Sequence, residues 1–171
     1  MWTKEVPISH LSSMFDGAVE KVVTPTMFQI RTFWDSSWNT SPVRVRLFGL
    51  ISPDRNSETY KEAMSYAQTL DGELKIDVGL GTLNSHGRST TFGVYSMGKD
   101  GVLNCSINYL VFNPDGLEIG MREEVHDYAE ELLFLGFAKI DPQTKPIPVA
   151  WTLAEAKAKA AARGIWLRSY R

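Results

Sequence analysis

Residues 43–54 read VRVRLFGLISPD, and this stretch decides the fold prediction. Its first five residues alternate between apolar and cationic side chains, which is the period of a strand with one buried face. The strand is expected to run from Val43 to Ile51 and to end in the turn Ser52-Pro53-Asp54, where proline breaks the pattern. A helix is expected next, over residues 58–70, because its apolar residues recur at helical spacing.

The rest of the chain adds more strands and two more helices. Strands are expected in runs that are β-rich or alternate in polarity, at 17–23, 27–33, 74–78, 90–95 and 103–112. A second helix is expected over 122–135, with Gly136 as its C-cap. A third is expected to begin at a capping box of Thr152 and Glu155 and to stop at Gly164. The order of elements predicts an α+β domain.

Composition limits the class of protein. A chain of 171 residues can form one domain with a sizeable core, and its net charge is −2 with a pI of about 5.9. This charge argues against nonspecific binding to polyanions, which depends on Lys and Arg. Cys105 is the only cysteine, which fits an intracellular reducing compartment, either cytoplasm or an organelle matrix. No apolar run approaches the roughly 18 residues of a membrane span, and the first residues lack a secretory pattern.

Five segments, taken in chain order, resemble the staphylococcal nuclease family. They are RLFGLISPD at 46–54, YKEA at 60–63, HGR at 86–88 with the strand after it, ELLFLGFAK at 131–139, and the last helix with GIW at 164–166. The resemblance implies a five-stranded OB-like β-barrel with three helices over residues 17–171, following an N-terminal extension at 1–16. It also implies phosphodiester hydrolysis assisted by calcium as the ancestral chemistry.

By motif position, Arg46 and Arg88 match the two arginines that neutralise the phosphate, and Asp54 replaces the family's catalytic glutamate. Each has a structural alternative. Arg46 could pair with Asp54 or Glu62, Arg88 could be an ordinary loop cation, and Asp54 could be a turn residue.

The family's calcium ligands are not matched. Thr26 and Ile51 stand where the resemblance places aspartates, and only Ser52 keeps an acceptable oxygen. Because carboxylate count tunes calcium affinity, losing both acids should weaken binding severely. A shifted alignment would use Asp16-Gly17 as the first turn instead, but residues 17–23 resemble the first strand itself. His10, His86 and His126 show no zinc spacing.

Compared with the family, residues 98–122 resemble an insertion before the second helix. It holds the apolar run Tyr109, Leu110, Val111 and Phe112, and an apolar edge strand invites pairing with another chain. The alternative is an extra hairpin that packs only on its own barrel. Trp34 and Trp38, in the first hairpin loop, are further candidate partner contacts, as is Trp2.

The sequence therefore favours a non-catalytic nuclease-like domain that acts as a binding or assembly module, as a subunit of a protein or ribonucleoprotein complex. Other protein subunits are the expected partners, and no cofactor is expected. Single-stranded RNA or DNA could also bind through Arg44, Arg46 and Arg88. The alternative function is a divalent-metal-dependent phosphodiesterase that cleaves DNA or RNA, in which case calcium is the expected cofactor.

Overall fold

The fold is of the α+β class, with three α-helices and a mixed β-sheet, as seen in a computed structural model. The structure describes residues 14–34, 37–38, 42–70, 90–112 and 123–167. The strands are β1 (Met14–Thr24), β2 (Met27–Trp34), β3 (Ser37–Trp38), β4 (Val43–Leu47), β5 (Leu50–Ile51), β6 (Thr90–Met97), β7 (Leu103–Phe112), β8 (Glu123–Asp127) and β9 (Lys139–Ile140). The helices are α1 (Glu58–Ala67), α2 (Tyr128–Leu135) and α3 (Val149–Ala160), with 3-10 turns η2 (Gln68–Leu70) and η4 (Gly164–Trp166).

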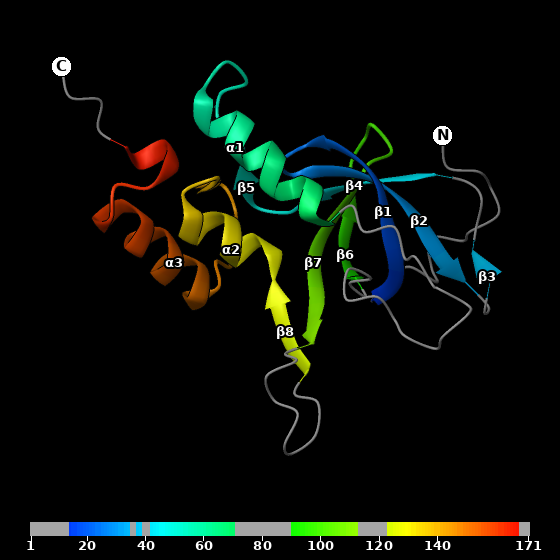
Figure 1. The fold of residues 1–171 in the computed structure, drawn as a ribbon. Helices are drawn as coiled ribbons and strands as arrows, with labels where there is room; N and C mark the ends of the chain where they lie inside the picture. Colours follow the sequence, from blue (N-terminus) through cyan, green and yellow to red (C-terminus); the bar gives the residue numbers. More distant parts are fainter. Residues whose placement is uncertain (1–13, 35–36, 39–41, 71–89, 113–122, 168–171) are drawn as a thin grey trace.

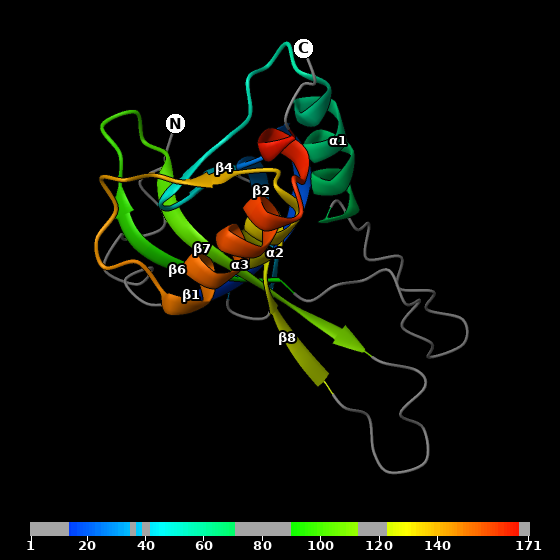
Figure 2. The same cartoon turned by 90° about the vertical axis from the view of Figure 1, so that its left-hand side faces the viewer.

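Among the described residues, the main sheet has seven strands. β1 pairs with β2, β2 with β4, β4 with β7, β7 with β6, and β6 with the start of β1, and only the β4–β7 pair is parallel. β3 pairs antiparallel with the end of β2, and β8 pairs antiparallel with the end of β7. β5 and β9 form a separate two-stranded sheet. Helices α2 and α3 lie together on one side of the strands, while the ends of β7 and β8 project from the body (Figures 1 and 2).

The alternation predicted for the deciding stretch is confirmed, because Val43, Val45 and Leu47 are buried while Arg44 is exposed. The strand is shorter than expected and ends at Leu47. Gly49 then adopts a φ of +80°, and residues 50–51 turn away to pair with β9. These buried side chains join Phe28, Ile30 and Phe92 in one core with α2.

The strand predicted over 103–112 is confirmed, and its interpretation as an edge strand is wrong for residues 103–105 and 108–109, which pair on both sides. Residues 103–109 of β7 pair with β6, residues 103–105 also pair with β4, and residues 108–112 pair with β8. β7 is thus internal as far as Tyr109, whereas among the described residues 110–112 pair with β8 alone. The strand β1 also begins at Met14, inside the segment assigned to an N-terminal extension, because its first residues pair with β6.

The second helix begins later than predicted. Residues 123–127 form β8, because their backbones pair with β7 from Asn108 to Phe112. The Asp127 carboxylate then accepts a hydrogen bond from the Ala129 amide at 3.0 Å and caps the helix. Strand pairing and this cap therefore override the helical pattern of the apolar residues.

The capping box predicted for the third helix is wrong. The helix begins at Val149, one turn earlier, and Thr152 lies inside it. The Glu155 carboxylate accepts a hydrogen bond from the Ile140 amide at 3.0 Å and also pairs with Lys159 at 3.0 Å. Glu155 therefore holds β9 against α3 and does not cap the helix. The predicted strand at 74–78 and the turn at 113–116 lie outside the described residues.

Candidate functional site

Two positions of the nuclease-like motif lie side by side. Thr26 follows β1 in the β1–β2 turn, and Ser52 follows β5; their hydroxyl oxygens are 2.8 Å apart and share a hydrogen bond. Thr26 is only 7% exposed, and its carbonyl accepts a hydrogen bond from the Leu47 amide at 2.8 Å. The two neutral hydroxyls thus satisfy one another at the place where the resemblance expects metal ligands.

The residues at this place do not fit a calcium ion. Ile51 contributes an apolar side chain that is 37% exposed. Within the described residues, no group of three or more His, Cys, Asp or Glu side chains is arranged to hold a metal. Hydroxyls alone provide little of the negative oxygen that calcium requires.

Arg46 lies on β4 opposite Met27, the residue that follows Thr26, and it has a carboxylate partner. Its Nη2 donates to Oδ2 of Asp100, which lies in the β6–β7 turn, at 2.5 Å. Neither Asp54 nor Glu62, the partners considered from the sequence, makes this contact. The Val102 amide and then the Arg46 guanidinium hold the pKa of Asp100 below its ordinary value. A phosphate at Arg46 would have to share the guanidinium with this carboxylate or displace it.

Asp54 has the geometry of a turn residue. Its carboxylate accepts a hydrogen bond from the Asn56 amide at 2.8 Å, and its carbonyl accepts one from the Ser57 hydroxyl at 2.6 Å. Ser57 in turn caps α1 by accepting a hydrogen bond from the Tyr60 amide. Asp54 therefore stabilises the turn that leads into α1. Arg88, the remaining motif residue, lies outside the described residues.

The predicted partner contacts are only partly described. Tyr109 is 4% exposed and is not a surface contact, because its ring is buried between the sheet and α2. The backbones of Leu110, Val111 and Phe112 pair with β8, and those of Trp34 and Trp38 lie in the β2–β3 pairing.

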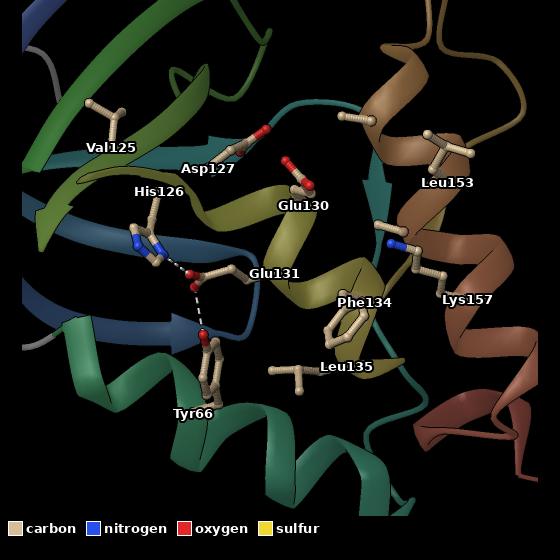
Figure 3. A pocket seen from close by; sticks show the side chains of 12 residues that line it. Tyr66, Val125, His126, Asp127, Glu130, Glu131, Phe134, Leu135, Leu153 and Lys157 are labelled. Atoms are coloured by element: carbon tan, nitrogen blue, oxygen red, sulfur yellow. Dashed lines mark hydrogen bonds and ion pairs between the residues drawn. The ribbon is translucent and has the colours of Figure 1, made fainter.

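A second site, which the sequence did not indicate, centres on Glu131 of α2. Tyr66 of α1 donates its hydroxyl proton to Glu131 Oε2 at 2.5 Å, and the Tyr109 hydroxyl of β7 donates to the same oxygen. Nδ1 of His126, on β8, lies 2.7 Å from Glu131 Oε1. One carboxylate therefore joins four elements, as Figure 3 shows for Tyr66, His126 and Glu131. Burial, and then the hydrogen bond to Glu131, raise the pKa of Tyr109 above its ordinary value, so this hydroxyl remains a donor.

This network forms one wall of a groove of about 590 Å³ between β8, α2 and α3. Val125, Phe134 and Leu153 line it and are 69%, 39% and 56% exposed. Its charged lining groups are Asp127, Glu130, Glu131 and Lys157. The volume lies within the range of ligand-binding pockets. The one signal for this site in the sequence is an acidic residue, Glu131, next to the apolar run of α2. It is a weak signal, because the three partners of Glu131 come from separate parts of the chain.

Cys105 does not supply a reactive thiol. It is fully buried on β7, and burial raises its pKa from 9.0 to about 12. Only the thiolate is nucleophilic, so the folded chain should react with iodoacetamide at pH 8 far more slowly than the urea-unfolded chain.

The same shift predicts a dependence of stability on pH. Below pH 9 the thiol is neutral in both states; as pH rises from 9 toward 12, only the unfolded thiol ionises, and stability is lost. Urea unfolding should show a loss of up to about 1.4 kcal/mol per pH unit that is missing in Cys105→Ala. Equal slopes for the two proteins would contradict a buried thiol.

Within the described residues, no helix has both the length and the apolar character needed to cross a bilayer. A comparison with protein-family models finds none that matches the chain, and a search among curated proteins finds no match either.

Proposed function

We propose that this chain is a non-catalytic domain with a staphylococcal nuclease-like fold, which acts as a binding or assembly module in a larger protein or ribonucleoprotein complex. The observation that carries the proposal is the hydrogen bond between Thr26 and Ser52. Two hydroxyls that are paired with each other, a buried one on Thr26 and a half-buried one on Ser52, stand where calcium-binding oxygens are expected. The Arg46–Asp100 pair adds support, because a carboxylate already occupies the candidate phosphate ligand.

The proposal includes an OB-like barrel as the core of the fold. It is supported by the sequence of strand pairings, which passes from β1 through β2, β4, β7 and β6 and returns to β1. Within this series the β4–β7 pair is parallel and the other four pairs are antiparallel. This mixed order of pairings is compatible with the proposed barrel. Function belongs to the site, so a persisting fold is compatible with lost catalysis.

The alternative is an active phosphodiesterase. The observation in its favour is that Arg46 pairs with Met27, the residue that follows Thr26, and that its side chain is 35% exposed. A substrate phosphate could compete with Asp100 for this guanidinium. Asp54 would then have to leave its turn hydrogen bonds to act on water.

A binding and cleavage assay separates the two functions. Titration calorimetry with calcium and a nucleotide bisphosphate should show no saturable binding below about 1 mM, the weak limit of protein calcium sites. Single-stranded DNA and RNA should remain intact with calcium, magnesium or manganese. An active nuclease of the family is the positive control. Cleavage that is lost in both Arg46→Ala and Arg88→Ala would reject the proposal and support the phosphodiesterase.

A further inference from the structure

The groove between β8, α2 and α3 has the chemistry of a peptide-binding surface. Three large apolar side chains, Val125, Phe134 and Leu153, are exposed along it although apolar side chains gain free energy when they leave water. Clustered exposed apolar residues that are rimmed by charges mark interaction sites. The α2–α3 surface therefore has both a recess and an apolar lining for a partner.

The charges around the groove select a cationic occupant. Three carboxylates line it, from Asp127, Glu130 and Glu131, against the single ammonium group of Lys157. The Asp127 carboxylate is fixed by hydrogen bonds from the Ala129 amide and the Trp151 indole, and Glu131 is fixed by its three partners. These two carboxylates are thus held in place before any partner arrives. Fixed charges favour complementary partners and disfavour like-charged ones.

Three other classes of occupant are disfavoured by the same charges. Nucleic acids and anionic membranes are polyanions, and the three carboxylates repel them. A second copy placed across a two-fold axis would bring the same acidic rims together. The chain's own Arg163 stacks 4.2 Å from the Phe134 ring centroid, an internal example of a cation against this apolar surface.

We infer that the groove binds a segment of another protein that carries large apolar side chains bordered by Lys or Arg. This inference rests on the proposed binding function and states the chemistry of the partner. The apolar side chains would cover Val125 and Leu153, and the cations would face Glu130 and Asp127. Affinity would come mainly from apolar burial and selectivity from charge.

The test uses two fluorescein-labelled amphipathic peptides with the same Leu and Phe positions, one with Lys and one with Glu at the remaining positions. Fluorescence anisotropy with the full chain should give a Kd of about 10 μM for the Lys peptide and at least about tenfold weaker binding for the Glu peptide. Leu153→Ser should weaken the Lys peptide about tenfold, because the apolar contact is lost. Glu130→Lys should weaken it about fivefold and strengthen the Glu peptide.

Matched control variants keep the test specific. Met97→Ser removes an exposed apolar side chain from β6, and Glu62→Lys reverses an exposed charge on α1; neither residue lines the groove, and both variants should bind as the unmodified chain does. The thermal midpoint of every variant is compared to verify folding. Absent binding of the Lys peptide, equal binding of both peptides, or no effect of Leu153→Ser would overturn the inference.

The outcome is separable from that of the cleavage assay. A chain that binds the Lys peptide and also cleaves nucleic acid would reject the non-catalytic function and keep the groove assignment. A chain that neither cleaves nor distinguishes the peptides would reject the groove assignment alone.

Discussion

Gly164→Ala is expected to lower the free energy of unfolding by about 3 kcal/mol, and Gly136→Ala by a similar amount. Both glycines have positive φ, +52° and +74°, which favours glycine over every residue with a side chain. Their backbones also touch. A Cβ atom on Gly164 would lie 2.1 Å from the Gly136 carbonyl oxygen, and one on Gly136 would lie 2.2 Å from the Arg163 carbonyl oxygen.

This contact holds η4 on the C-terminal end of α2. The Ile165 amide donates to the Gly136 carbonyl at 2.9 Å, which joins the C-terminal cap of α2 to η4. An added methyl group must separate the two backbones and break this hydrogen bond. Because neither neighbour is the end of a flexible side chain, the contact cannot relax at low cost.

Gly101→Ala is the matched control for this contact. Gly101 has a φ of +77°, but no atom beyond its two chain neighbours lies within 4 Å of its added Cβ position. This variant should lower the free energy of unfolding by only about 1 kcal/mol, the cost of placing a residue with a side chain in the left-handed conformation. Urea unfolding followed by tryptophan fluorescence measures all three variants. A loss in Gly164→Ala no larger than that in Gly101→Ala would show that the two backbones are not in contact.

Local patterns in the sequence predicted elements but not the contacts between them. The apolar and cationic alternation of 43–47 requires only one buried face, so β4 was predictable. Gly136 was predicted as a helix cap and Gly164 as a stop, each from its own neighbours. Their contact joins positions 28 residues apart by the numbering, and no local pattern encodes it.

The errors share one physical cause, which is that tertiary hydrogen bonds override local propensity. Residues 123–127 carry part of a helical stripe, yet pairing with β7 makes them a strand. Arg46 finds its partner 54 positions away in Asp100, whereas sequence reasoning considered only acids close to it in the chain. The Glu131 site was missed for the same reason, since its partners come from α1, β7 and β8.

Glu131→Gln is expected to lower the free energy of unfolding by about 2–3 kcal/mol, because hydrogen bonds to a charged acceptor are worth more than those to an amide. The carboxylate accepts from two tyrosine hydroxyls through one oxygen and contacts the His126 ring through the other. A glutamine offers one neutral acceptor oxygen and an amide that can only donate, so both tyrosine hydroxyls lose their charged acceptor and the His126 ring faces an uncharged group. The substitution therefore loosens α2 from both α1 and β8.

The pH dependence of stability provides a second readout that a simple packing defect would not change. The pKa of Tyr109 is raised above its ordinary 10.0 by burial, and then by the hydrogen bond and charge of Glu131. Below pH 10 this tyrosine is neutral in both states; as pH rises further, the unfolded tyrosine ionises first and stability falls. In Glu131→Gln the acidic contribution is gone, so the alkaline loss should be shallower than in the unmodified chain.

Glu130→Gln is the control, because Glu130 is the preceding residue on α2 and is exposed. It should change stability by no more than about 0.5 kcal/mol and leave the alkaline slope unchanged. If Glu131→Gln behaves like this control, the four elements are not joined through one carboxylate. If it is destabilised and its alkaline slope becomes shallower, Glu131 fixes β8 and α2 together. Those are the elements that contribute Val125, Phe134 and Glu130 to the groove, so its shape depends on this half-buried acid.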